Sequence, residues 1–308
     1  MRAMMNRRNF SRNIAGAALG ASALTRGSAL EQNAQPAAHD SGVPFQLSVM
    51  LWALGRKHSF GQRLEQCAQA GYKNAQLTGE YKSWSDDEFD RYLNKAKELG
   101  IRFDLTSGLK HSLGNPADRD ALLEDLRNEL PLMERLNCPA LIVMSGNLVP
   151  GMPRAVQHQS CIDGLKRAAA VIEGKQIAGL PVRILLENID PEENPRYYLQ
   201  SVAEGFEIMK AVNHPQVQFL YDFFHEQIAE GNLIEKLEKN IQYTGVVHIA
   251  DVPGRHRPGT GEINYENIFR KLGELKFSHV AAMEFLPAGD PVEELRGARE
   301  MALRCGRV

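Results

Sequence analysis

Four short apolar segments in the second half of the chain each end in a side chain that can bind a metal ion. Three of these side chains are carboxylates and one is an imidazole, in the order Glu187, Asp222, His248 and Glu284. Burying a carboxylate at the end of an apolar segment is unfavourable unless it is hydrogen-bonded or ionised beside a cation. A single such residue is more often a helix cap or a satisfied polar group. Four in equivalent positions predict a shared divalent cation.

Such a site requires parallel strands whose carboxyl ends meet. The chain has eight short apolar segments without strict alternation, separated by amphipathic segments of helical period, and this pattern is typical of a buried parallel sheet. We expect strands at 45–54, 72–77, 101–106, 140–144, 182–187, 217–222, 244–249 and 279–285. We expect helices at 59–70, 85–99, 118–136, 160–177, 196–212, 225–239, 265–272 and 291–305.

Eight strand-and-helix units predict an α/β fold, a single (β/α)8 TIM barrel over residues 43–308. The length of this region is close to the roughly 250 residues typical of such a barrel, although two domains of ordinary size would also fit. Active sites of these barrels lie at the C-terminal ends of the strands, where the interior opens into loops. The four candidate ligands fall at that end.

The first 42 residues have a different character. The arginine pair Arg7-Arg8 precedes an uncharged segment rich in Ala and Gly, and the small residues Gly27-Ser28-Ala29 suit a peptidase. This arrangement is typical of a twin-arginine signal peptide followed by a flexible leader, and a disordered basic tail is the alternative. The apolar segment is shorter than the roughly 20 residues that span a membrane. We therefore predict a periplasmic or exported protein that uses the twin-arginine export machinery and has no stable membrane anchor.

Composition excludes some partners. A formal net charge of −2 gives no electrostatic basis for binding nucleic acid or an anionic membrane. The cysteines are widely separated and form no C-x-x-C pair, so we expect free, packed thiols rather than disulfides. They are Cys67, Cys138, Cys161 and Cys305.

The candidate ligands also indicate which metal is bound. Oxygen ligands with one imidazole suit Mn²⁺, Mg²⁺ or Co²⁺ better than a structural zinc site, which favours thiolates. We expect one divalent ion per chain, Mn²⁺ or Mg²⁺, with Co²⁺ and Zn²⁺ as alternatives. Open coordination positions would make the ion a Lewis acid in catalysis.

Several motifs resemble the hydroxypyruvate isomerase group of the xylose isomerase-like TIM barrel superfamily, which also holds sugar isomerases, ketose 3-epimerases and nucleases of the endonuclease IV type. The similarity spans essentially all of residues 43–308, and its most specific part is V-P-G-R followed by P-G-T-G-E-I-N. The motifs are Met50-Leu51-Trp52, Leu185 to Ile189, Tyr221 to His225, His248 to Arg255, Pro258 to Tyr265 and Glu284 to Pro287.

The resemblance implies a metal shell of Glu187, Asp222, His248 and Glu284, with Glu187 and Glu284 also acting as the acid/base pair. One position departs from the pattern, because hydroxypyruvate isomerases tend to have Gln where this chain has His248. Histidine there is similar to the tagatose and psicose epimerase branch. That branch also shares the Asp-x-x-His motif of Asp222 and His225.

The implied activity is a metal-dependent isomerisation of a small hydroxy-keto acid or sugar. Removing a proton beside a carbonyl builds negative charge on oxygen, and a bound metal stabilises the resulting cis-enediolate. The carboxylates of Glu187 and Glu284 would take the proton from carbon and return it. A ketose 3-epimerase of the tagatose or psicose type is the main alternative. The resemblance also implies a homo-oligomer.

Two further classes are disfavoured. A nuclease of the endonuclease IV type would need additional metal ligands at the ends of the second and third strands and a basic surface. The chain has Gln76-Leu77-Thr78 and Leu105-Thr106-Ser107 at those ends. A noncatalytic sugar-binding barrel would not need both Glu187 and Glu284.

Four other residues are candidates for binding substrate. His225 follows Asp222 by three residues, where strand gives way to helix, although a histidine there is also an ordinary helix start. Arg255 lies before a Pro- and Gly-rich loop and could clamp a carboxylate or polyol oxygens. Glu193 lies where the resembling epimerases carry a substrate-contacting Glu, with solvation as the alternative. Trp52 at the end of the first strand is either a pocket wall or simple packing.

Overall fold

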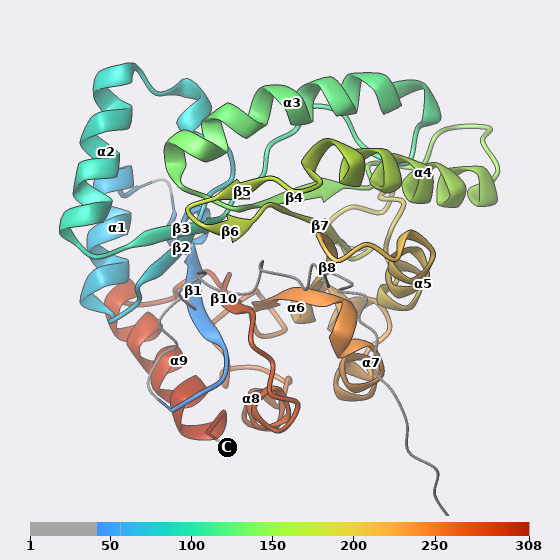
Figure 1. The fold of residues 1–308 in the computed structure, drawn as a ribbon. Coiled ribbons are helices and arrows are strands. Elements are labelled where there is room, and N and C mark those ends of the chain that lie inside the picture. The colour runs from blue at the N-terminus through green and yellow to red at the C-terminus, as the bar shows by residue number, and fades with distance from the viewer. Residues whose placement is uncertain (1–41, 56, 308) are drawn as a thin grey trace, which may run out of the picture. The chain divides into compact units, whose positions relative to one another are not determined.

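The computed structural model describes residues 42–55 and 57–307 and contains an eight-stranded parallel sheet curled into a barrel (Figure 1). The barrel strands are β1 (Gln46–Met50), β2 (Asn74–Gln76), β3 (Arg102–Leu105), β4 (Ala140–Met144), β7 (Arg183–Glu187), β8 (Val217–Asp222), β9 (Thr244–Ile249) and β10 (Val280–Met283). Their order in the sheet is β3-β2-β1-β10-β9-β8-β7-β4.

The two outermost strands of this order, β3 and β4, meet through a parallel bridge between Thr106 and Leu141. The Thr106 N–H donates to Ala140 O at 3.0 Å, and the Ile142 N–H donates to Thr106 O at 2.8 Å. This bridge joins the edges of the sheet, so the predicted (β/α)8 barrel is confirmed.

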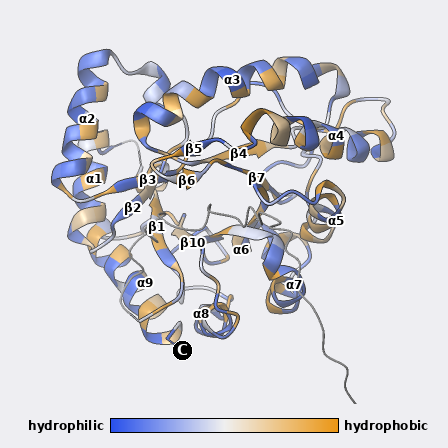
Figure 2. Cartoon of the chain, in the orientation of Figure 1, coloured by the Kyte–Doolittle hydropathy of each residue, from blue (hydrophilic) through white to orange (hydrophobic). Residues whose placement is uncertain are grey.

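Helices surround the barrel (Figure 1). They are α1 (Phe60–Gln69), α2 (Asp86–Glu98), α3 (Arg119–Leu136), α4 (Arg154–Ile172), α5 (Val202–Val212), α6 (Phe223–Ala229), α7 (Leu233–Asn240), α8 (Tyr265–Glu274) and α9 (Pro291–Cys305). Short 3₁₀ turns add η1 (Leu51–Leu54), η2 (Glu80–Ser83), η3 (Pro116–Asp118) and η4 (Ile241–Tyr243). Hydrophilic and hydrophobic residues are interspersed along the α-helices, as expected for helices with one face packed on the barrel (Figure 2).

Local sequence explains where the helices begin. The side chain of Ser85 accepts from the Glu88 N–H while the Glu88 side chain accepts from the Ser85 N–H, which is the predicted capping box of α2. Ser59 and Gln62 form the same motif at α1. These caps satisfy backbone N–H groups at the first turn and so fix where each helix begins.

The structure differs from the sequence prediction in three helical regions. The fourth helix ends at Ile172 instead of continuing to 177, because Gly174 adopts a φ of 71° and a hairpin of β5 (Gln176–Ile177) and β6 (Leu180–Pro181) follows. The helix predicted at 225–239 is two helices, α6 and α7, because Gly231 has a φ of 68°. The fifth helix, predicted from residue 196, begins only after Ser201, whose side chain accepts from the Glu204 N–H.

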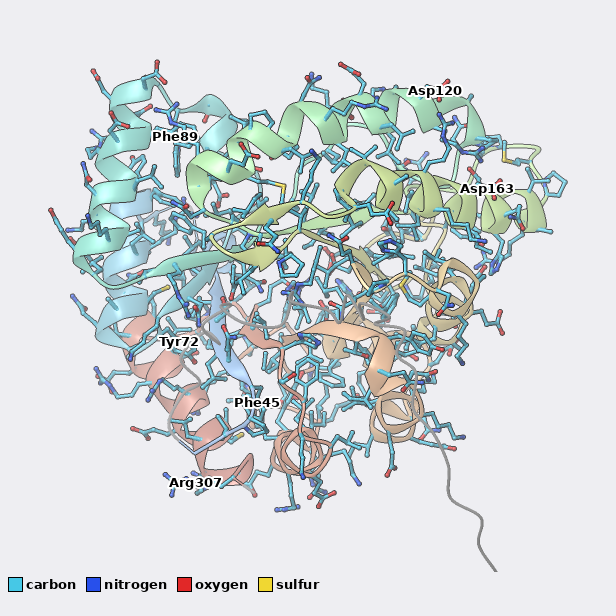
Figure 3. All side chains as sticks on the ribbon, in the orientation of Figure 1. Phe45, Tyr72, Phe89, Asp120, Asp163 and Arg307 are labelled. Atoms are coloured by element: carbon cyan, nitrogen blue, oxygen red, sulfur yellow. The ribbon has the colours of Figure 1, made fainter. Side chains whose placement is uncertain are left out.

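The barrel interior is packed with apolar side chains midway along the strands, and side chains fill the space between all elements (Figure 3). Side chains of β7 and β8 alternate in direction, so Leu185 and Leu220 point inward between polar residues at the two ends of their strands. The interior layer consists of Met50, Leu105, Ala140, Ile142, Leu185, Leu220, Val246, Val280 and Ala282. It separates the C-terminal mouth of the barrel from the N-terminal mouth.

The remaining sequence predictions concern thiols and targeting. All four cysteines are free, and Cys67, Cys138 and Cys161 are buried, as expected. Within the described part of the chain, no helix is both long and apolar enough to cross a membrane. The predicted export leader falls on residues 1–42 and so lies, except for Gly42, outside the described residues.

Candidate active site

The four predicted metal ligands meet at the C-terminal mouth of the barrel. Glu187 and Asp222 are the last residues of β7 and β8, His248 lies in β9, and Glu284 directly follows β10. The strand register pairs Asp222 with His248. All four side chains are buried, and one ligand atom from each lies within 4.8 Å of the others. The sequence-predicted cluster is therefore a single site.

The imidazole of His248 is oriented as a metal ligand would be. Its Nδ1 lies 2.7 Å from Glu284 Oε2 and 3.6 Å from Glu187 Oε1, yet this buried atom has no hydrogen bond within the described structure. Its Nε2 lies 2.8 Å from the amide oxygen of Gln76, which can only accept. A proton is therefore held on Nε2, and Nδ1 is the ring nitrogen that faces the carboxylates and would face a cation between them. Three carboxylates and a bare imidazole nitrogen fit a divalent cation.

The charges of this cluster shift its pKa values in opposite directions. Burial raises the pKa of Glu187. Burial also acts to raise the pKa of Glu284, but the positive charges of His248 and Arg255 outweigh it and hold that pKa below its ordinary value. Burial lowers the pKa of His248, while Glu284 and Glu187 raise it, to about 10. Without a cation the ring therefore also carries a proton on Nδ1, and a bound cation would take the place of that proton. The two glutamates differ in proton affinity.

Arg255 connects the predicted ligands to the predicted substrate contacts. Its Nη1 donates to Glu193 Oε2 at 2.8 Å, and its Nη2 donates to Glu284 Oε2 at 2.8 Å and to Asp222 Oδ2 at 3.3 Å. Its Nε donates to the backbone oxygen of Glu284 at 3.2 Å. The Glu193 side chain is 52% exposed, so this residue is a paired rim carboxylate that solvent still reaches.

His225 lies on the other side of Asp222. Its Nε2 is 3.4 Å from Asp222 Oδ2, and its Nδ1 is 2.5 Å from Asp190 Oδ2 and 3.8 Å from Glu193 Oε2. Burial lowers the pKa of His225, but Asp222 and Asp190 raise it, to about 9. The imidazole is therefore positively charged near neutral pH and lies buried among Asp222, Asp190 and Glu193.

Trp52 forms part of the site wall. It lies in η1, its Nε1 donates to Glu284 Oε1 at 2.7 Å, and the Arg255 guanidinium lies 5.4 Å from its ring centre. The same ring borders a cavity of about 740 Å³. The other residues lining this cavity are Gly55, Arg63, Thr78, Gly79, Glu80 and Leu286. Trp52 thus orients one glutamate and faces open space.

Sequence analysis missed two buried carboxylates of this mouth. Asp190 accepts from the backbone N–H of Glu193 and pairs with His225. Asp251 accepts from the backbone N–H groups of Gly259 and Gly261, and so orders the Pro- and Gly-rich loop. The signal available for both was an acidic residue three positions past a candidate ligand.

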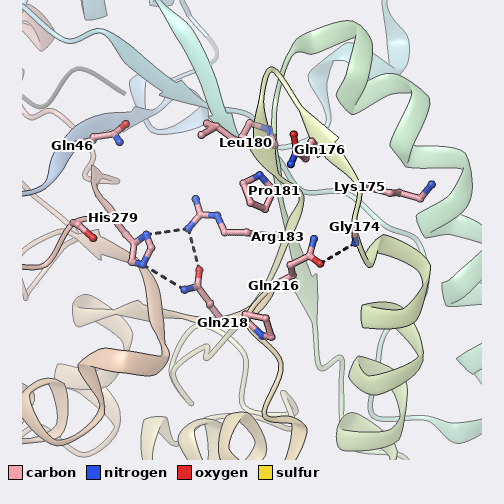
Figure 4. A pocket seen from close by; sticks show the side chains of 13 residues that line it. Gln46, Gly174, Lys175, Gln176, Leu180, Pro181, Arg183, Gln216, Gln218 and His279 are labelled. Carbon is pink, nitrogen blue, oxygen red and sulfur yellow. Dashed lines mark hydrogen bonds between the residues drawn. The ribbon is translucent and has the colours of Figure 1, made fainter. Parts of the chain in front are cut away.

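A second cavity, of about 650 Å³, lies at the N-terminal mouth and contains no predicted site residue (Figure 4). Arg183, at the start of β7, points toward Gln218 and His279 there. Its Nη1 donates to Gln218 Oε1 at 3.0 Å and contacts His279 Nδ1 at 3.4 Å. The two cavities are at opposite ends of the packed interior.

The chain is thus a TIM barrel whose C-terminal mouth contains a buried cluster of three carboxylates and one imidazole that could hold a metal ion. The chain belongs to the xylose isomerase-like TIM barrel family, whose model matches residues 64–304.

Several relatives of this chain are named as isomerases. A 2-oxo-tetronate isomerase from Haemophilus influenzae is 30% identical over 241 residues, covering 77% of this chain and 91% of that protein. A 2-oxo-tetronate isomerase from Pectobacterium atrosepticum is 34% identical over 165 residues, covering 54% of this chain and 61% of the relative, less than two thirds of its length. A Danio rerio protein provisionally named hydroxypyruvate isomerase is 28% identical, covering 81% and 92%.

Solved structures share the fold. An AP endonuclease, family 2 from Brucella melitensis is 23% identical with a TM-score of 0.72, covering 81% of this chain and 96% of that one. D-psicose 3-epimerase from Clostridium cellulolyticum H10 is 16% identical with a TM-score of 0.71, covering 85% and 100%. The IOLI protein, which holds a zinc atom, is 18% identical with a TM-score of 0.70, covering 85% and 98%. At these identities the likeness concerns the fold alone.

Proposed function

We propose that this chain is a metal-dependent isomerase of a small hydroxy-keto acid or a related sugar, acting by proton transfer between neighbouring carbons. The observation that carries the proposal is that Glu187 and Glu284, from β7 and β10, both approach the bare Nδ1 of His248. The names of the relatives, hydroxypyruvate and 2-oxo-tetronate isomerase, support the substrate class.

The site residues fit one divalent ion. When bound by Glu187, Asp222, His248 and Glu284, it would supply the positive charge that stabilises an oxygen anion beside the reacting carbon. Asp222 also accepts from the Phe224 N–H, at 2.7 Å, through its other oxygen. This bond fixes the direction in which Asp222 presents its free oxygen.

Glu187 is suited to carry the proton. Burial raises the pKa of Glu187, which strengthens this carboxylate as a base that takes a proton from carbon and returns it to the neighbouring carbon. Glu284 stays ionised because His248 and Arg255 lower its pKa, and Trp52 holds one of its oxygens. Two carboxylates with divergent proton affinities divide acid/base and anionic roles.

Two cations at the rim would orient the substrate. Arg255 and the protonated imidazole of His225 both lie against Asp222, and each has N–H groups that can donate to a substrate carbonyl, hydroxyl or carboxylate oxygen. The cavity beside Trp52 offers space for the part of the substrate that does not react.

A ketose 3-epimerase is the second candidate. The two glutamates come from strands on either side of β9, so a proton removed on one face of a substrate carbon could be returned on the other. Isomerisation and epimerisation begin with the same proton removal, and substrate shape would decide between them.

The test is a screen of hydroxypyruvate, 2-oxo-tetronate, free ketoses and aldoses in deuterated water with Mg²⁺, monitored by NMR. Movement of the carbonyl with deuterium incorporation supports isomerisation, whereas inversion at one carbon with deuterium incorporation supports the epimerase. The screen is repeated with Mn²⁺ in place of Mg²⁺, and the Mn²⁺ is removed before the NMR measurement. If no compound exchanges hydrogen with either ion, the isomerase and the epimerase proposals are both contradicted.

We also propose that residues 1–42 direct export and that residues 43–308 form the mature enzyme. The Arg7-Arg8 pair and the following apolar segment support this assignment. In a bacterial host with a twin-arginine pathway, the Arg7→Lys, Arg8→Lys variant should remain in the cytoplasm while the unchanged chain reaches the periplasm. Equal distribution of the two by cell fractionation would overturn the assignment.

A further inference from the structure

We propose that Gln76 and Asp104 form an orienting pair beneath the cation site, which holds His248 in the tautomer that presents a bare Nδ1. Both residues are positioning residues in this proposal, since they act through the imidazole. The inference concerns the cation site and does not depend on the identity of the substrate.

Gln76 contacts the far side of the His248 ring, the side opposite the carboxylates. It is the last residue of β2, is fully buried, and its Oε1 lies 2.8 Å from His248 Nε2. The two residues are 172 positions apart in the chain. An oxygen acceptor at this place requires a proton on Nε2 and leaves the Nδ1 lone pair for a cation.

The direction of the Gln76 amide decides the tautomer, because an amide has a donor end and an acceptor end. If its NH₂ group faced His248, Nε2 would have to accept and Nδ1 would carry the proton toward the carboxylates. A proton there would occupy the position that a cation needs. Some neighbour of Gln76 must therefore select one direction.

Asp104 on β3 is that neighbour. Both of its carboxylate oxygens are buried, and the side chains of Ser48 and Gln76 lie close enough to lower its pKa, although the contact geometry falls short of a regular hydrogen bond. A carboxylate only accepts, so the NH₂ group of Gln76 faces Asp104 and its carbonyl faces His248. The orientation of the amide thus follows from the charge beneath it.

The charge on Asp104 has support from the N-terminal mouth. Burial raises the pKa of Asp104 to about 7, while the positive charges of Arg183 and Arg102 act to lower it. Arg183 extends into the barrel mouth from β7 (Figure 4). The positive charge of Arg183 thus favours the ionised form of Asp104.

A purely structural role predicts different behaviour from an orienting role. If Gln76 and Asp104 only fill the interior, replacing them should change the free energy of unfolding without a specific effect on cation affinity. If they orient His248, affinity should fall even where the fold is retained, because outer partners of metal ligands typically contribute about 10- to 100-fold in affinity.

The first experiment compares Zn²⁺ and Mn²⁺ affinity by calorimetry for the full chain and the Gln76→Met variant. Met has a similar length and no acceptor, so we expect affinity to fall about 10- to 100-fold. The matched control is Gln157→Met, because Gln157 is equally buried but bonds to the backbone of Val149 and Asn147. Its affinity should stay within about twofold of wild type. Equal affinity in Gln76→Met and wild type would overturn the proposal.

A second pair of variants tests direction and remains informative if Gln76→Met does not fold. Asp104→Asn lets the Gln76 amide turn either way, so affinity should fall. In the double variant Gln76→Glu with Asp104→Asn, the new carboxylate at position 76 accepts from His248 Nε2, and the new amide at position 104 donates to that carboxylate. The affinity for the cation should therefore recover. Failure of the double variant to bind better than Asp104→Asn would overturn the proposal.

The spectroscopic readout is the tautomer itself. In zinc-loaded protein labelled with ¹⁵N-histidine, the two-bond correlation pattern distinguishes a proton on Nε2 from one on Nδ1. We expect the Nε2–H form for His248 in wild type and in the double variant, and loss of that single form in Asp104→Asn. A wild-type protein that binds neither ion, or an unchanged pattern in Asp104→Asn, would contradict the proposal.

Discussion

The two mouths of the barrel are built from the same strands with different chemistry. At the N-terminal mouth, β7 begins with Arg183, Gln218 is the second residue of β8, and His279 directly precedes β10. At the C-terminal mouth, the same strands end with or precede Glu187, Asp222 and Glu284. The guanidinium of Arg183 has neutral partners at one end, whereas three carboxylates surround an imidazole at the other.

This difference indicates that the N-terminal mouth contributes to stability and that the C-terminal mouth contains the candidate active site. At the N-terminal mouth, Arg183 donates to Gln218 and contacts a histidine whose pKa is lowered by burial and by Arg183, to about 4, so the group is neutral. The C-terminal carboxylates repel one another, are partly compensated by Arg255 and His225, and would be stabilised further by a cation. Barrels of this kind tolerate the second arrangement because the first, with the packed interior, supplies the stability.

The largest expected effect falls on the C-terminal glutamates. Glu187→Gln and Glu284→Gln should each lower the rate of solvent-hydrogen exchange into substrate by about 10²- to 10⁴-fold, since general acid/base catalysis contributes this much. Exchange measured by NMR on the substrate identified in the screen tests this.

The control lies at the other mouth, where His279→Gln should keep full exchange activity at pH 7.5. If both glutamine variants exchange normally, the assignment of Glu187 and Glu284 to proton transfer is wrong.

Acid should act first on the N-terminal mouth. His279 has a pKa of about 4 in the folded chain against 6.5 for the ordinary group, so between these values the unfolded state binds more protons. Its contribution is complete above pH 6.5 and is lost as pH falls toward 4, amounting to about 3 kcal/mol. Urea unfolding of wild type and His279→Gln at pH 7.5 and pH 4.5 measures it. Equal losses in both proteins would assign the acid sensitivity elsewhere.

Cation binding should stabilise the folded chain through the residues of the C-terminal mouth. At a Mn²⁺ concentration 100 times Kd, the gain is about 2.7 kcal/mol, which raises Tm by roughly 5 to 10 °C for a domain of this size. Chelator-treated protein titrated with Mn²⁺ in a thermal scan shows the shift. Asp222→Asn should remove most of it, whereas His279→Gln should retain it. A shift that survives in Asp222→Asn would place the ion at another site.

The smallest expected effect concerns the Trp52 bond to Glu284. Trp52→Phe keeps a ring beside Arg255 and removes the donor, which should cost about 1.5 kcal/mol and lower kcat/KM about tenfold. The Trp52 N–H is one of the groups that lower the pKa of Glu284, so its removal weakens the preference of that carboxyl for the ionised form. Steady-state kinetics of both proteins measure kcat/KM, and equal values would show that Trp52 serves only as packing.

Sequence patterns predicted those parts that depend on local order. Glu187 and Asp222 were identifiable because each closes a short apolar strand, and strands in parallel bring their ends together. Asp190 was missed because its role depends on a loop that folds back onto α6 to reach His225. The hairpin after Ile172 was missed because an apolar period continues past Gly174, where the backbone turns.

Polar contacts between residues far apart in the chain could not be predicted from the sequence, because they do not depend on local order. Gln76 was considered only as a residue that is not a metal ligand, and nothing in its neighbourhood indicates a partner in β9. Periodicity reports which face of an element is buried, but it does not report which polar atoms on buried faces meet.

The single bridge between Thr106 and Leu141 gives the barrel a seam. Fewer hydrogen bonds cross there than between any two strands of β10-β9-β8-β7, so amide exchange in the native state should begin at the seam. The strands that carry the predicted metal ligands are contiguous, and neither β3 nor β4 is among them. Hydrogen bonds at the seam can therefore open while β7, β8, β9 and β10 keep the register that holds these four side chains together.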